Sequence, residues 1–82
     1  MGSYEVQTAR SDELGLSLRE RDVLPVLAEG LDTKQIALRL GISASTVRFH
    51  VCSLTRKLGV NGRAELCLRA AESGVIRRAD GR

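Results

Sequence analysis

Apolar residues along most of the chain recur at the spacing of an α-helix, and each periodic segment is followed by a glycine. The first segment begins at Ser17, with Glu20 placed to complete a capping box, and ends at Gly30. Pro25 falls about two turns inside this segment, where a proline removes one backbone hydrogen bond. We therefore expect a helix with a kink or an irregular turn near Arg21–Leu24.

The next two segments are separated by a very short turn. The second helix is predicted to start at Asp32, where Gln35 completes another capping box, and to stop at Gly41. Ser43 can then cap a third helix over residues 44–58. A turn this short, with glycine where a positive φ is needed, is typical of a helix-turn-helix unit.

The third helix has two distinct faces. Its apolar residues recur at positions i, i+4, i+7 and i+11 and predict the buried face: Val47, Val51, Leu54 and Leu58. The opposite face carries polar, basic and aromatic residues: Ser45, Arg48, Phe49, Cys52 and Arg56. A helix that presents such a face can enter the major groove of DNA.

A fourth helix is predicted from about Gly62 to Ser73, with Asn61 as its cap. One apolar stripe on it, which we expect to pack on the domain, consists of Ala64, Cys67, Leu68 and Ala71. Leu66 and Ala70 lie off that stripe. A second apolar patch on so small a protein indicates a partner surface, most simply a copy of the same chain. The alternative is that Val75-Ile76 folds back over the helix.

Charge is distributed unevenly along the 82 residues, whose net charge is +3. Residues 1–32 carry three basic and seven acidic groups, residues 65–82 carry four and three, and residues 33–64 carry six basic groups and no acidic one. The acid-free stretch coincides with the predicted helix-turn-helix, which favours a polyanionic partner. An ordinary solvated basic face is the alternative reading.

The length allows one small domain. We expect that domain to occupy residues 16–76. Residues 1–15 open with a segment typical of an expression tag and continue as a polar, aperiodic stretch, which predicts a tag with a flexible linker or N-terminal arm. Residues 77–82 are expected to form a disordered tail.

Other classes of protein find little support in the sequence. Cys52 and Cys67 are the only cysteines and His50 is the only histidine, a set without metal-ligand spacing, so no metal and no cofactor are expected. The sequence has no nucleophile–base pair or phosphate-binding glycine loop, which argues against an enzyme. It has no signal peptide and no apolar run of membrane-spanning length, so we expect a reduced, cytoplasmic protein.

Several short motifs follow one another in a characteristic order: Leu16-Ser17-x-Arg19-Glu20, Lys34-Gln35-Ile36-Ala37, Leu40-x-Ile42-Ser43, Thr46-Val47-Arg48-x-His50 and Lys57-Leu58-Gly59-Val60-x-x-Arg63. Together they resemble the LuxR-type (NarL/FixJ, GerE-like) DNA-binding domain. The resemblance implies an all-α, four-helix (tetrahelical) helix-turn-helix domain of a bacterial transcriptional regulator. It also implies a homodimer, formed through the fourth helix, on an operator with two half-sites in double-stranded DNA.

The resemblance assigns roles by position. Base contacts fall on Arg48, Phe49 and Cys52. Backbone contacts fall on Thr33, Lys34, Ser45, Thr46, Arg56, Lys57 and Arg63. We place the dimer interface at Leu66 and Ala70. RNA polymerase is a further candidate partner, and association with the nucleoid would follow from DNA binding.

Two other functions compete with this one. Region 4 of a sigma factor uses a similar helix-turn-helix to bind a promoter element, but the Lys57–Arg63 segment, followed by a further apolar helix, disfavours it. A small helical adaptor for an acidic protein would tolerate basic residues anywhere on its surface. Here the basic residues follow the turn and the third helix, which favours DNA.

Overall fold

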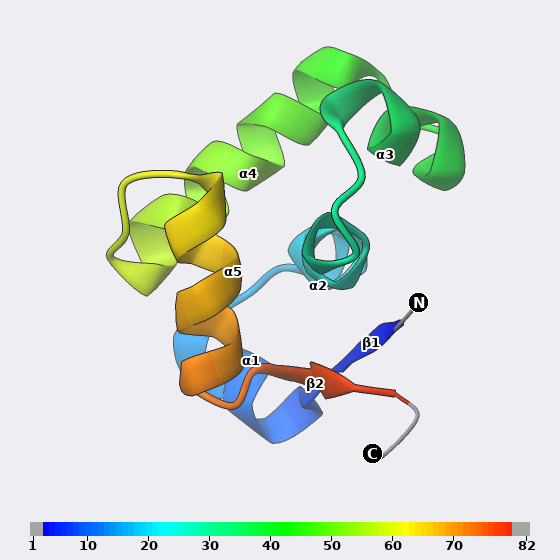
Figure 1. Ribbon diagram of the computed structural model, residues 1–82. Helices are drawn as coiled ribbons and strands as arrows, with labels where there is room; N and C mark the ends of the chain where they lie inside the picture. Colours follow the sequence, from blue (N-terminus) through cyan, green and yellow to red (C-terminus); the bar gives the residue numbers. More distant parts are fainter. Residues whose placement is uncertain (1–2, 80–82) are drawn as a thin grey trace.

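The computed structural model describes residues 3–79, which fold into five helices and one small ribbon of two strands (Figure 1). In chain order the elements are β1 (Tyr4–Val6), α1 (Thr8–Leu14), α2 (Leu18–Ala28), α3 (Thr33–Leu40), α4 (Ala44–Leu58), α5 (Arg63–Glu72) and β2 (Ile76–Arg78). The predominance of helices confirms the predicted all-α class, and α2 to α5 are the four expected helices. No helix within residues 3–79 is long and apolar enough to cross a membrane.

The predicted capping box starts α2. The Glu20 backbone N–H donates to Ser17 Oγ at 3.2 Å, and the Ser17 N–H donates to Glu20 Oε1 at 2.8 Å. α2 remains helical through Pro25, so the irregular turn expected near Arg21–Leu24 is absent. A proline inside a helix costs about 3 kcal/mol, whereas each buried Val or Leu side chain contributes about 1.5–3 kcal/mol. α2 buries four of them, at positions 23, 24, 26 and 27.

The helix-turn-helix unit has the predicted limits. Asp32 and Gln35 form the capping box of α3, and Gly41 ends that helix in the left-handed conformation at φ 68°. Ser43 then caps α4 by accepting a hydrogen bond from the Thr46 N–H at 3.1 Å. A non-glycine residue at position 41 would pay a steric cost for the left-handed φ. The turn is therefore encoded locally.

α4 is the central element, since it packs against α2, α3 and α5. Figure 1 shows it running across one side of the molecule from α3 to α5. The buried apolar core consists of Leu16, Val23, Leu24, Val26, Leu27, Ile36, Val47, Leu54, Leu58, Val60, Leu66, Ala70, Val75 and Ile76. Every helix from α2 to α5 contributes to this core. The helix-turn-helix unit, α3 and α4, is therefore packed against the rest of the domain.

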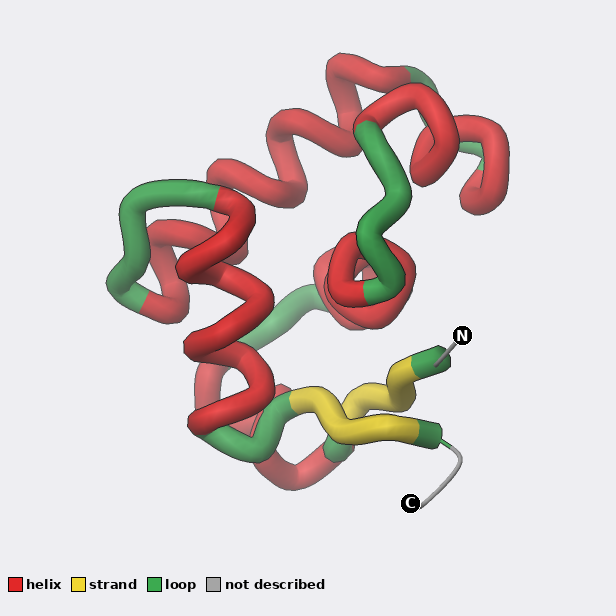
Figure 2. Tube along the Cα trace, in the orientation of Figure 1, coloured by secondary structure: helices red, strands yellow, loops and turns green. Residues whose placement is uncertain are grey.

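The expected flexible arm at residues 1–15 is folded wherever the structure describes it. β1 pairs with β2 in antiparallel register, with Val6 opposite Ile76, and the ribbon is visible beside α1 in Figure 2. Tyr4, Val6 and Leu14 pack against the core. β1 contacts both α2 and the strand that lies some 70 residues downstream, and no local periodicity reveals these contacts. Residues 1–2 of the expected arm lie outside the described residues.

The C-terminal tail expected at residues 77–82 likewise begins with structure, since Arg77 and Arg78 belong to β2. Residues 80–82 lie outside the described residues. The cap expected at Asn61 is also wrong, because α5 starts after Gly62 and has no side-chain cap. The Asn61 backbone N–H instead donates to Glu65 Oε1 at 3.3 Å. Glu65 thus satisfies the backbone ahead of the helix where a side-chain cap was predicted.

Candidate nucleic-acid interface

One face of α4 is exposed to solvent and carries the side chains that the sequence predicted. Arg48, Phe49, Cys52 and Arg56 are all exposed, while Val47 and Leu54 on the opposite side are completely buried. The predicted division of the helix is thus confirmed. We call the exposed side the reading face, defined by residues 45, 48, 49, 52 and 56.

Three basic side chains of this region have no carboxylate partner in the described part of the chain. Within residues 3–79, neither Lys34, Arg48 nor Arg56 forms an ion pair. The Nη2 of Arg48 makes only a long hydrogen bond, 3.4 Å, to Ser45 Oγ. Cations without partners retain their full attraction for phosphate. The other two basic residues of the unit have carboxylate partners: Arg39 Nη1 lies 3.8 Å from Glu29 Oε1, and Lys57 pairs with Glu20.

The aromatic ring of Phe49 is the most distinctive apolar group on the reading face. It is 67% exposed and contacts His50 edge to face, with ring centroids 5.6 Å apart. His50, which is half-buried, thus contacts the Phe49 ring beside the reading face. A large apolar group held in this way on a polar helix can pack against the methyl group of thymine.

Five of the seven predicted phosphate-contacting residues make hydrogen bonds within the protein: Thr33, Ser45, Thr46, Lys57 and Arg63. Thr46 Oγ1 lies 2.8 Å from Ser43 Oγ beside the turn. Arg63 donates to the Leu31 carbonyl at 2.5 Å and to Thr33 Oγ1 at 3.4 Å. Arg63 and Thr33 are 30 residues apart in sequence, yet the fold brings them together. Arg63 therefore holds the connection between α2 and α3, in addition to any contact with DNA.

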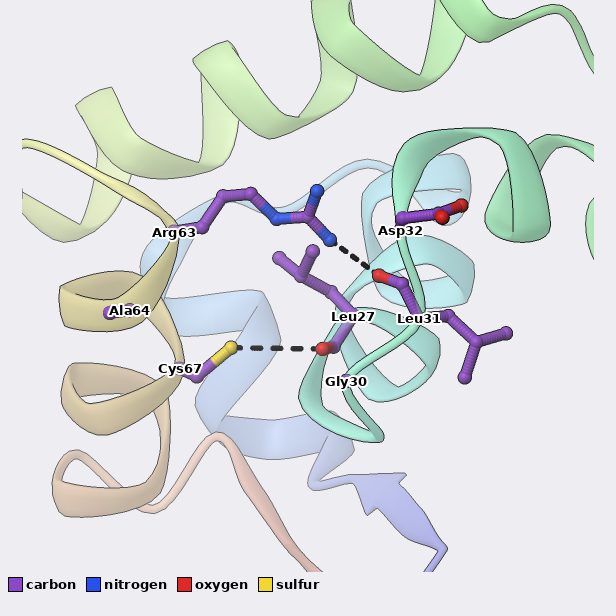
Figure 3. Close-up of a pocket in the computed structure, with 7 residues that line it drawn as sticks. All are labelled: Leu27, Gly30, Leu31, Asp32, Arg63, Ala64 and Cys67. Carbon is purple, nitrogen blue, oxygen red and sulfur yellow. Dashed lines mark hydrogen bonds between the residues drawn. The ribbon is translucent and has the colours of Figure 1, made fainter.

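Figure 3 shows this arrangement around a shallow hollow between α2 and α5. Its lining consists of Leu27, Gly30, Leu31, Asp32, Arg63, Ala64 and Cys67. Cys67 Sγ donates to the Leu27 carbonyl at 3.9 Å. Burial raises the pKa of the Cys67 thiol, and the nearby Arg63 cation only partly opposes this rise. The thiol is therefore a packing group of the interior, as the sequence indicated.

Lys57, predicted as a phosphate contact, has two hydrogen-bond acceptors within the protein. Its Nζ donates to Glu20 Oε1 at 2.7 Å and to the Gly15 carbonyl at 2.8 Å. The carboxylate that it meets is 4% exposed. We therefore infer that the amino group serves the fold by neutralising a buried acid. The helical pattern misses the pair because its members are 37 residues apart.

The electrostatics of Glu20 fit this structural role. Burial by itself raises the pKa of the Glu20 carboxyl. Hydrogen bonds from Lys57, from Ser53 and from the Ser17 backbone outweigh burial and lower that pKa below its ordinary value of 4.5. Glu20 is therefore ionised at neutral pH and ties α2 to the last turn of α4.

The expected dimer interface also needs correction. Leu66 and Ala70 are 0% exposed and belong to the core, so neither can contact a second chain in the folded state. Val75 and Ile76 fold back beside α5, which was the alternative reading of the pattern. The exposed apolar side chain on α5 is instead that of Leu68, at 59%. It lies one turn from two exposed small residues, Ala64 and Ala71, so the stripe that was expected to pack on the domain is largely exposed, with only Cys67 half-buried.

Comparison with known proteins identifies the family. A family model described as GerE, bacterial regulatory proteins of the luxR family, matches residues 14–70. The spore germination protein GerE of Bacillus subtilis is 41% identical over 61 residues, which cover 74% of this chain and 82% of that protein. The nitrate/nitrite response regulator NarL of Escherichia coli K12 is 43% identical over 58 residues, 71% of this chain and 27% of NarL.

A solved structure agrees with these relatives. The structure of the transcription factor GerE has a TM-score of 0.66 and 39% sequence identity, and the match covers 72% of this chain and 88% of that one. The chain spans about a third or less of the length of several other curated relatives that it matches. The motifs, the four-helix arrangement and these matches agree: the chain belongs to the luxR family of bacterial regulatory proteins and contains its helix-turn-helix DNA-binding domain.

Proposed function

We propose that this chain reads a specific sequence in double-stranded DNA by placing α4 in the major groove, as the effector domain of a bacterial transcriptional regulator. The observation that carries the proposal is the reading face itself. It is exposed along the length of α4 and contains no acidic residue. The helix behind it is fixed by fully buried side chains. A rigid helix with an open basic face is what major-groove recognition needs.

The roles within the interface differ by chemistry. Arg48 presents its guanidinium on the reading face, and an arginine can bind guanine O6 and N7 with two hydrogen bonds. Phe49 offers an apolar surface to thymine, and the neighbouring Cys52 adds a small side chain. Lys34 and Arg56 have no ion pairs within the described part of the chain, so they are the best candidates for phosphate contacts.

Four further residues complete the proposed phosphate-facing edge. Thr33 lies in the first turn of α3, where free backbone N–H groups favour an anion. Ser45 and Thr46 occupy the same position at the start of α4. Arg63 keeps part of its donor capacity while it holds the Leu31 carbonyl. These contacts would set the register of the protein on the duplex without specifying its sequence.

We further propose that the domain binds a two-half-site operator as a homodimer, through the exposed side of α5. Leu68 is the large apolar group of that side, and Ala64 and Ala71 allow close approach of a second helix. A patch of this size buries little area, so the dimer would be weak in solution and would be stabilised by binding to DNA. RNA polymerase remains a candidate further partner.

Selection of bound sequences from random DNA tests the proposal, followed by measurements on Arg48→Ala and Lys34→Ala. Arg48→Ala should lose about 1–3 kcal/mol on the selected operator and relax the preference at one base position. Lys34→Ala should weaken binding to all sequences and reduce the slope of log affinity against log salt by about one. If both variants lose the same affinity on operator and random DNA, the assignment of roles is wrong.

A further inference from the structure

Residues 3–15, here called the strap, are fastened to the far end of α5. The Gln7 backbone N–H donates to the Val75 carbonyl at 2.8 Å, directly after the β1–β2 pairing. One helical turn later, Arg10 Nε donates to the Ser73 carbonyl at 2.8 Å. Both acceptors follow α5, so the strap fixes the point at which α5 ends.

The other end of the strap contacts the last turn of α4. The Gly15 carbonyl accepts a hydrogen bond from Lys57 Nζ, the same amino group that pairs with Glu20. Between the two ends the strap is well anchored, since Ser11 is completely buried and its carbonyl accepts from the Leu16 N–H at 3.0 Å. A single continuous segment thus touches the ends of both α4 and α5.

The strap does not cover the reading face. None of its hydrogen bonds or ion pairs in the described part of the chain involves Arg48, Phe49 or Cys52. An influence of the strap on base recognition would therefore act through the position of the helices. Base recognition is sensitive to such changes, because productive contacts require side chains to be held within about 0.5 Å.

We propose that the strap is a positioning element for DNA recognition. When it is docked, it holds the last turn of α4 and the end of α5 in the arrangement that fits the operator. When it is released, the reading face keeps its chemistry but loses its alignment, so affinity for the specific sequence falls. Any force or partner that acts on the N-terminal side of the domain can then control DNA binding through this segment. The inference rests on the DNA binding proposed above.

A pair of proline substitutions isolates the strap. Gln7 has φ −88° and ψ 110°, which proline tolerates, so Gln7→Pro removes the bond to Val75 with little strain. Thr8→Pro is the matched control. Thr8 is the first residue of α1, where the N–H has no helical partner and proline is accepted.

A second pair acts on side chains alone. Arg10→Ala removes the bond to Ser73, and Glu13→Ala removes only the exposed ion pair between Arg10 and Glu13. If Gln7→Pro fails to fold, this pair decides the question. Both pairs lie in the strap and leave every proposed DNA contact in place.

Each variant is assayed for affinity to the selected operator and to random DNA, at a temperature well below its unfolding transition. Gln7→Pro and Arg10→Ala should lose roughly 2- to 10-fold in operator affinity, the equivalent of one hydrogen bond, and bind random DNA as wild type does. Equal operator affinity in these variants and their controls overturns the proposal. Equal losses on both kinds of DNA overturn it as well, since they indicate less active protein rather than misalignment.

Amide hydrogen exchange without DNA separates this proposal from the proposed function. The Val60 N–H donates to the Thr55 carbonyl at 2.9 Å and reports on the end of α4. Its exchange should accelerate in Gln7→Pro and not in Thr8→Pro. If wild type selects no sequence from random DNA, the proposed function fails, and Val60 exchange alone then decides whether the strap is coupled to α4.

Discussion

Lys57→Met tests whether Lys57 serves the fold, as the structure indicates, or a phosphate, as the sequence suggested. Methionine keeps most of the length of the side chain but removes the amino group. The Glu20 carboxylate then loses its cationic partner while remaining almost fully buried. It keeps the Ser17 backbone donor at 2.8 Å and the Ser53 hydroxyl. The substitution thus removes one defined interaction from a buried acid.

The magnitude follows from the burial of the two partners. Removing one partner of a buried pair costs about 3–5 kcal/mol. The Lys57 side chain is 33% exposed, so water already screens part of the attraction. We therefore expect a loss of about 2–3 kcal/mol in the free energy of unfolding. A domain of this length has about 4–12 kcal/mol, so the variant should fold and melt roughly 8–24 °C lower.

The pH dependence has a definite sign. Because the pKa of Glu20 is lower in the folded protein than its ordinary value of 4.5, its ionised form stabilises wild type at neutral pH. That contribution is lost as the pH falls below 4.5 and through the folded pKa. In Lys57→Met, fewer hydrogen-bond donors oppose the effect of burial on the Glu20 carboxyl, so the pKa of Glu20 rises. The stability gap between the two proteins should therefore narrow between pH 7 and pH 4.

Urea unfolding followed by circular dichroism measures this gap, and operator binding at several salt concentrations measures the DNA contact. Arg56→Met is the control, because Arg56 is exposed and has no ion pair within residues 3–79. It should keep its stability and reduce the salt slope by about one. A Lys57→Met protein with unchanged stability and a reduced salt slope would refute the structural role and return Lys57 to the phosphate contacts.

Three further predictions concern other parts of the molecule. Leu68→Glu should leave the melting temperature nearly unchanged and weaken binding to a two-half-site operator more than binding to a half-site. Leu66→Glu places a charge in the core, so a thermal melt of this variant should show no folded domain. Iodoacetamide at pH 8 should label exposed Cys52 before half-buried Cys67, because the raised pKa of Cys67 leaves little thiolate. Mass spectrometry of timed samples measures both rates, and equal labelling of the two cysteines would contradict the prediction. Gly41→Ala should cost about 1 kcal/mol in urea unfolding, and an unchanged midpoint would argue against strain at its φ of 68°.

The local features of the fold were predictable because each depends on residues a few positions apart. Three helix starts were predicted from the capping boxes at Ser17 and Asp32 and the cap at Ser43. The turn between α3 and α4 was predicted from Gly41. The faces of α4 followed from its periodicity. α2 was also expected to continue through Pro25, and it does, without the irregular turn that was one of the two expected distortions. The local error was the cap at Asn61, since α5 starts after Gly62 without a side-chain cap.

The sequence by itself determined the helix-turn-helix and its reading face, since capping and periodicity act within a few residues. Only the tertiary structure decided which charges remain available to DNA and which apolar residues remain exposed. Lys57 was assigned the same role as its neighbour Arg56, but in the structure it pairs with Glu20. Leu66 was expected at a partner surface and Leu68 in a packed stripe, whereas the structure buries Leu66 and exposes Leu68. The strap needed the same information, because β1 meets β2 across almost the whole chain. Periodicity shows which face of a helix is buried, but it does not show which distant residue that face meets, because the pairing depends on how the helices pack.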